Sequence, residues 1–181
     1  MKKGLFVSIL VLIMGGFFSS LGVADDTLAE FKGGIGVIPV SSAAGTANAN
    51  GTFPDVNRNV VRTVNPPGQI WTIDDLKAKV KTDGSITVDG RGLLLAGGNG
   101  IGTNAGASVF ATLICEAAAP FTLHNTSLVG VPLQANGDFQ IDDVLAPPPP
   151  AVCASPVLLI RNAANQAWFA AGIQKTDKRE D

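Results

Sequence analysis

Alternation of apolar and charged residues after position 75 constrains the fold more than any other feature of the sequence. Every second residue from Leu76 to Val80 is apolar, and the residues between them are lysines. A two-residue period is typical of a half-buried β-strand. A helix is the alternative, because Thr72 followed by Asp74-Asp75 also fits the N-terminal cap of a helix. The residues that follow the alternation decide between these alternatives.

The tripeptide Thr82-Asp83-Gly84 favours the strand. It fits a three-residue hairpin loop with glycine in the left-handed position. Such a loop sets apolar residues opposite one another and a lysine opposite an aspartate. The expected pairs are Val80 with Ile86, Ala78 with Val88, and Lys77 with Asp89. A two-residue Asp83-Gly84 loop would mix the faces, so we predict a hairpin over about residues 76–95.

A second turn of the same kind lies at Ala135-Asn136-Gly137, and it predicts a hairpin over about residues 128–142. That loop would set Leu133 opposite Phe139 and Val131 opposite Ile141. Between the two turns, the segment 108–115 is apolar on both faces of a strand, which indicates a central position in a sheet.

Short β segments account for most of the remaining chain, and no convincing long helix is found. We predict an all-β fold of about eight to ten short strands, either an antiparallel β-sandwich or a small β-barrel. The expected organisation is a signal peptide at residues 1–24, one β domain at 25–174 and a disordered charged tail at 175–181. Residues 41–59, rich in small and polar side chains, are expected to form a long surface loop, whose role stays open.

The N-terminus predicts export, with a secreted or periplasmic product. Two lysines precede an apolar run from Leu5 to Phe18, and Gly22 and Ala24 give the small side chains needed for cleavage before Asp25. A membrane anchor is the alternative, but the run is short for a bilayer and no second one follows. Too few aromatic residues remain for the girdles of an outer-membrane barrel, so no stable membrane insertion is expected. The short signal is compatible with a bacterial source.

The charge composition limits the classes of partner that we expect. Loss of Lys2 and Lys3 with the signal reduces the 13 basic residues to 11, against 15 acidic ones, for a net charge of −4. This dispersed acidic balance gives no basic stripe for phosphates, so nucleic acid is not an expected partner. A glycan and a protein remain the alternative classes of partner.

Both cysteines, Cys115 and Cys153, belong to the exported part. An even number of cysteines in an oxidising compartment indicates a disulfide. A reactive or metal-binding pair is the alternative, but the spacing is not that of a metal motif and His124 is the only histidine.

Candidate ligand-binding residues are few. Trp71 and Trp168 could stack on sugar rings if exposed, although their apolar neighbours favour a place in the core. The alternating oxygen-bearing residues Asp55, Asn57 and Asn59 resemble the start of a calcium loop, but Val60 and Pro66 stand where such a loop has glycine and glutamate.

No set of histidine, cysteine and serine converges on a catalytic pattern. The glycine-rich loop at residues 97–102 matches a dinucleotide fingerprint only loosely, because a strand rather than a helix is expected to follow it. The leading hypothesis is an exported non-enzymatic β domain with a binding or structural role in the envelope or extracellular matrix, without a cofactor. The alternatives are a carbohydrate-binding or carbohydrate-active domain that uses tryptophans and aspartates, and a calcium-dependent adhesion module.

Overall fold

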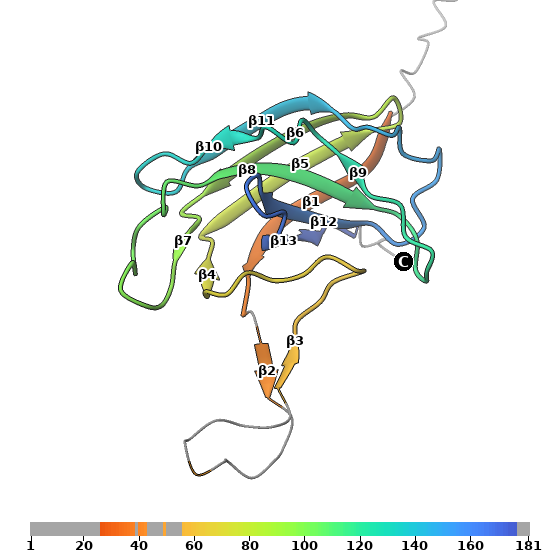
Figure 1. Ribbon diagram of the computed structural model, residues 1–181. Coiled ribbons are helices and arrows are strands. Elements are labelled where there is room, and N and C mark those ends of the chain that lie inside the picture. The colour runs from red at the N-terminus through yellow and green to blue at the C-terminus, as the bar shows by residue number, and fades with distance from the viewer. Residues whose placement is uncertain (1–25, 39, 43–48, 50–55, 177–181) are drawn as a thin grey trace, which may run out of the picture.

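The computed structural model describes residues 26–38, 40–42, 49 and 56–176, and every regular element among them is a β-strand (Figure 1). Within these residues no helix has the length and apolarity needed to cross a membrane. The strands are β1 (Thr27–Gly36), β2 (Val40–Ser42), β3 (Val56–Arg58), β4 (Trp71–Thr72), β5 (Asp75–Lys81), β6 (Ser85–Arg91), β7 (Leu94–Leu95), β8 (Ser108–Ile114), β9 (His124–Asn125), β10 (Val131–Pro132), β11 (Phe139–Val144), β12 (Val157–Asn162) and β13 (Trp168–Gln174).

Eight of these strands form an antiparallel barrel that is nearly closed. Their order is β10-β8-β12-β13-β1-β5-β6-β11, and β9 pairs with β8 beside β10. Two smaller pairs, β2-β3 and β4-β7, lie outside this barrel (Figure 1). The all-β prediction is therefore confirmed, in its barrel form.

The first hairpin forms as predicted. β5 and β6 pair with Val80 opposite Ile86, Ala78 opposite Val88, and Lys77 opposite Asp89. In the loop, the Gly84 N–H donates to the Lys81 carbonyl over 3.0 Å. Gly84 has a φ of +88°, a left-handed value that glycine adopts without steric cost. The ladder ends at Arg91, earlier than expected, and Leu94–Leu95 pairs with β4 instead.

The second predicted hairpin is wrong in its strands, although its turn forms. The Gly137 N–H donates to the Gln134 carbonyl over 2.8 Å, and the Gln134 N–H donates to the Asp138 carbonyl over 2.9 Å. Beyond this turn the two strands separate. Val131 lies opposite Val109 of β8, and Ile141 lies opposite Val88 of β6.

Contacts of the turn with the end of β6 explain this separation. The Leu93 N–H donates to the Gly137 carbonyl over 3.0 Å, and the Gly92 N–H donates to Asp138 Oδ1 over 3.1 Å. These bonds place the start of β11 beside β6. On the other side of the turn, Pro132 ends β10 and has no N–H to donate to a ladder. The turn therefore joins the two edges of the barrel.

A single bridge closes the opposite end of the same seam. The N–H groups of Asn125 and Ala146 each donate to the other residue's carbonyl, over 2.9 and 2.8 Å. The seam between β10 and β11 is thus held at both ends, which makes the barrel nearly closed.

The core fills the barrel and continues beneath a covering segment. β8 is central, as predicted, because β12 flanks it on one side and β9 and β10 flank it on the other. Every residue from Val109 to Ile114 is buried. The chain from 59 to 73 packs against this half of the barrel, where Trp71 stacks on Phe169 with ring centroids 3.9 Å apart.

Two boundaries differ from expectation. The sequence predicts a short polar entry at residues 25–32 and a first strand only from Phe31. β1 begins earlier, at Thr27, because Ala29 and Phe31 are buried and pair with β5. The expected disordered tail begins at Lys175, yet the Lys175 N–H donates to the Glu30 carbonyl over 2.9 Å. Residues 177–181 and the predicted signal peptide at 1–24 lie outside the described residues.

Candidate functional site

Both tryptophans lie in the core. Trp71 is 4% exposed and Trp168 is 3% exposed. One face of Trp71 is covered by Phe169, and the Trp168 indole N–H donates to the Asn59 carbonyl over 3.0 Å. Their burial argues against sugar stacking on either ring.

The candidate calcium residues are only partly described. Asp55 lies outside the described residues, and the backbone of Asn57 pairs with Ser41 in the β2-β3 ladder. Asn59 Nδ2 donates to the Ile38 carbonyl over 3.1 Å, so this amide stabilises the local backbone. Across the described part of the chain, no three side chains among His, Cys, Asp and Glu are placed to hold a metal ion.

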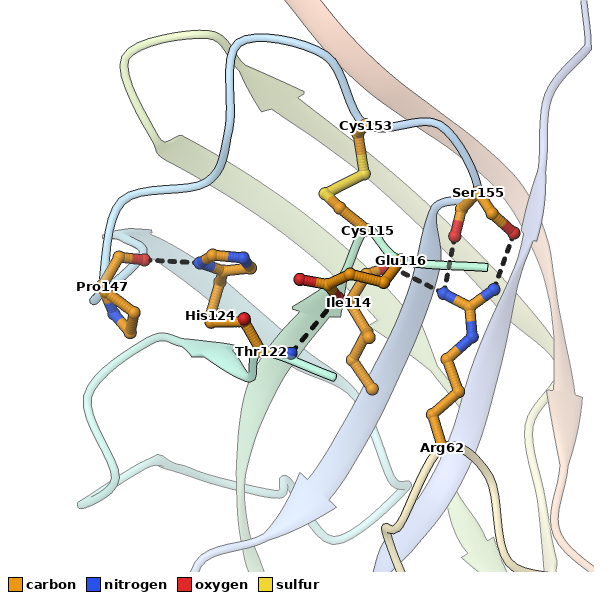
Figure 2. Close-up of a disulfide and its surroundings, with 9 residues drawn as sticks. All are labelled: Arg62, Ile114, Cys115, Glu116, Thr122, His124, Pro147, Cys153 and Ser155. Atoms are coloured by element: carbon orange, nitrogen blue, oxygen red, sulfur yellow. Dashed lines mark hydrogen bonds between the residues drawn. A yellow bond between two sulfur atoms is a disulfide. The ribbon is translucent and has the colours of Figure 1, made fainter. Parts of the chain in front are cut away.

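The predicted disulfide joins Cys115 to Cys153, with an S–S distance of 2.05 Å (Figure 2). Cys115 follows β8 directly, and the bond ties this end of β8 to the loop that leads into β12. The Ser155 N–H donates to the Cys115 carbonyl over 3.0 Å, which extends the β8–β12 pairing to the disulfide. The bond therefore fixes the start of β12 against the end of β8.

Arg62 clamps the same region from the covering segment. Its Nη1 donates to the carbonyls of Ser155 and Ile114 over 2.6 and 3.1 Å, and its Nη2 donates to Ser155 Oγ over 2.7 Å (Figure 2). Arg62 and Thr63 have φ values of 45° and 73° in a turn closed by a bridge between Val61 and Val64. A left-handed β-branched residue is strained, so the clamp holds a turn that its own residues disfavour.

Polar groups on the other side of the disulfide are used mostly within the fold. Glu116 accepts a hydrogen bond from the Thr122 N–H over 3.2 Å, and this bond lowers the pKa of the Glu116 carboxyl. His124 is buried, and its Nδ1 lies 2.8 Å from the Pro147 carbonyl oxygen (Figure 2). His124 Nε2 is buried without a hydrogen-bond partner among the described residues.

Arg161 is a buried cation that the sequence reading missed. Its Nε donates to the Gln166 carbonyl over 2.8 Å, and its guanidinium lies 5.0 Å from the centre of the Phe110 ring. Desolvation lowers the pKa of Arg161. The only signal in the sequence was a basic residue at the end of the apolar run from Val157 to Ile160, and the pattern did not show that this residue is buried.

A groove that is open to a ligand lies on the outer faces of β1, β5, β6 and β11. It has a volume of about 580 Å³. These four strands are consecutive in the barrel, and Figure 1 shows β5, β6 and β11 side by side at the top of the molecule. We call this feature the polar groove.

The strand register arranges the outward side chains of the polar groove in two rows. Residues in one row face one another across neighbouring strands, and each row crosses all four strands. One row is Lys32, Lys77, Asp89 and Gln140, and the other is Glu30, Lys79, Thr87 and Asp142. Basic residues are concentrated on β1 and β5, and both aspartates lie on β6 and β11.

Most charges of the polar groove have a partner. Lys175 Nζ lies 3.0 Å from Glu30, and Lys77 Nζ lies 3.1 Å from Asp75. Asp89 accepts from Arg91 Nε over 3.3 Å and from Gln140 Nε2 over 3.2 Å. Among the described residues no ion pair reaches Lys32.

A second hollow, of about 490 Å³, lies at one end of the barrel. Small residues such as Ala107 and Ala163 line it together with Leu128 and Val129. Leu128 and Val129 form the tip of a turn closed by the Gly130 N–H and the Ser127 carbonyl, and they are 49% and 83% exposed.

Of the outward side chains in the polar groove, the sequence predicted only that Lys77 lies opposite Asp89, and it did not link them with the residues of β1 and β11. The signal available was the run of lysines at alternate positions of β5. Comparisons of the chain with protein-family models, with curated proteins and with solved structures found no match.

Proposed function

We propose that this chain is an exported, non-enzymatic β-barrel domain that acts by binding, and that its ligand occupies the polar groove. The observation that carries the proposal is the groove itself, whose volume of about 580 Å³ is in the range of ligand sites. Its side chains project from four consecutive strands of one sheet, and such a frame positions them with little loss of freedom on binding.

The chemistry of the polar groove favours a polar ligand that is recognised by side chains. β5 and β6 are each paired on both edges, so their backbone groups are engaged in the ladder. An extended peptide therefore has no free strand edge at the centre of the groove on which to add. Ammonium, carboxylate, amide and hydroxyl groups remain for a ligand to contact.

Thermal unfolding of the purified protein in the presence of a library of oligosaccharides and short peptides tests this proposal. A compound that binds only the folded state, at 100 times its Kd, stabilises the fold by about 2.7 kcal/mol. We expect such a shift to disappear when Thr87 and Gln140 are both replaced by alanine. The matched control is Gln134→Ala, an exposed glutamine in the β10–β11 turn, which is expected to retain the shift.

Two results would contradict the proposal. One is a shift of equal size in the Thr87→Ala/Gln140→Ala variant, since binding would then occur elsewhere. The other is turnover of a library compound by the protein, since the domain would then be an enzyme.

A further inference from the structure

We infer that the polar groove binds an acidic oligosaccharide, with a carboxylate of the sugar held by Lys32 and Lys77 and its hydroxyl groups held on β6 and β11. This inference rests on the proposed function and names the ligand class for the same site. It is drawn from charges that the fold leaves unbalanced within the groove.

The first observation is a pair of like charges. Lys32 and Lys77 lie directly opposite each other on β1 and β5. Like charges at directly opposed positions destabilise a sheet. Lys77 is 3.1 Å from Asp75, whereas Lys32 is exposed and has no carboxylate partner among the described residues. An anion between the two ammonium groups would remove this repulsion and accept a charge-assisted hydrogen bond from each.

The second observation concerns the half of the polar groove on β6 and β11. Thr87 and Gln140 offer neutral donors and acceptors, and Asp89 and Asp142 are acceptors for hydroxyl groups. A polymer with a negative charge on every unit would be repelled by the two aspartates. A ligand with one anionic group and several hydroxyl groups matches both halves, and a sugar acid has this composition.

Other ligand classes fit less well. A nucleic acid would place several phosphates along the groove, including beside Asp89 and Asp142. A peptide would lack pockets for apolar side chains, because Phe31, Ala78, Val88 and Ile141 on the groove floor are buried and point into the barrel. An acidic oligosaccharide needs neither phosphate contacts nor apolar pockets.

Isothermal titration of the purified protein with a trisaccharide that carries one terminal glucuronic acid and two neutral sugars tests the inference. Maltotriose serves as the neutral sugar, and a tri-glutamate peptide serves as the acidic non-sugar. We expect the glucuronic acid trisaccharide to bind best and its affinity to fall as NaCl is raised. Lys32→Ala is expected to weaken binding roughly tenfold, the loss of about one charge-assisted hydrogen bond.

Matched variants distinguish the effect of the Lys32 charge on affinity from the effect of the net charge of the protein. Lys81→Ala removes the same charge from β5 outside the groove lining, where Lys81 pairs with Asp26 over 3.2 Å, and it is expected to leave the affinity unchanged. Asp142→Asn keeps an acceptor for hydroxyl groups and removes a negative charge, so it is expected to increase the affinity for the glucuronic acid trisaccharide.

The possible failures are distinguishable. Equal binding of maltotriose, unaffected by Lys32→Ala, would overturn the anionic ligand while leaving a binding role for the polar groove. Tighter binding of tri-glutamate would overturn the sugar. No binding of any of these probes would overturn the inference, and the library screen described above would still decide whether the groove binds another ligand.

Discussion

Loss of the Cys115–Cys153 disulfide is expected to lower the free energy of unfolding by about 4 kcal/mol. The two residues are 38 positions apart. The chain-entropy relation for a loop of that length gives a loss of about 4 kcal/mol at 25 °C. The intervening chain contains β9, β10 and β11, the strands on both sides of the barrel seam. Without the bond, the unfolded chain regains the freedom of this whole segment.

Urea unfolding followed by tryptophan fluorescence measures this loss, because Trp71 and Trp168 are buried in the folded state. The wild-type protein with and without reductant should be compared with the double variant Cys115→Ala/Cys153→Ala. Reduction retains both sulfur atoms, that of the buried Cys115 included, whereas the double variant removes them. The difference between the two therefore isolates packing at Cys115 from the entropy of the loop. In a thermal scan, the same loss corresponds to a Tm lower by about 10 °C.

The control is Val152→Ala, a substitution beside the disulfide at a side chain that is 77% exposed, which should leave stability unchanged. A loss below about 1 kcal/mol on reduction, with an unchanged urea dependence, would refute the reasoning. The segment between the cysteines would then be restricted in the unfolded chain even without the bond, and the disulfide would not hold the seam strands through loop entropy.

Two further changes test local features of the barrel. Gly90→Ala would place a Cβ 2.2 Å from the ring of Phe139, its partner across β6 and β11, and should cost about 1–3 kcal/mol in urea unfolding. Phe139→Leu should relieve part of this cost, and effects that are strictly additive in the Gly90→Ala/Phe139→Leu double variant would contradict a clash with the Phe139 ring. The control is Gly68→Ala, which has open space around it and should cost little. Glu116→Gln should reduce the loss of stability in acid. The pKa of Glu116 is lowered by its hydrogen bond from the Thr122 N–H, so its contribution is present above the ordinary glutamate pKa of about 4.3 and is lost as the pH falls through the lowered value. Unfolding curves at a series of pH values measure this, and an equal acid loss in wild type and variant would show that the bond contributes nothing.

The register of the first hairpin was predictable because all of its determinants are local. The turn residues set the loop length, and the alternation in both strands agrees with only one register. Val80 therefore faces Ile86 in the structure as in the prediction. The disulfide was predictable for a similarly simple reason, since the sequence contains only two cysteines.

The second hairpin could not be predicted because its strands have better partners elsewhere. The turn at Gly137 has the expected local geometry, with a φ of +82°. However, the N–H groups of Leu93 and Gly92 donate hydrogen bonds to this turn, although both residues lie more than 40 positions before it in the sequence. β11 then pairs with β6. Local pattern shows that Phe139 and Ile141 share a buried face, but it does not show which strand lies beside them.

The same limit applies to the candidate site. The alternation in β5 shows that Lys77 and Lys79 point outward. Their neighbours in the groove come from β1 and β11, which lie far from β5 in the sequence and join the sheet on either side of the β5–β6 hairpin. Lys32 and Lys77, two like charges, come to opposed positions only in the assembled sheet. The sequence therefore contained every side chain of the polar groove without showing that they form one surface.

The way the barrel closes accounts for the polarity of the polar groove. If β11 had stayed paired with β10, Gln140 and Asp142 would lie across the seam from the lysines of β5, and β6 would be an exposed edge. Because the 134–138 turn is bound to Leu93, β11 lies on β6 instead and adds its polar side chains to the rows that begin at Lys32 and Glu30. The same hydrogen bonds that protect the edge of β6 therefore place an acidic and amide-bearing strand beside the basic pair of β1 and β5. On this reasoning, the stability of the fold and the proposed recognition of a ligand with both anionic and hydroxyl groups depend on one turn.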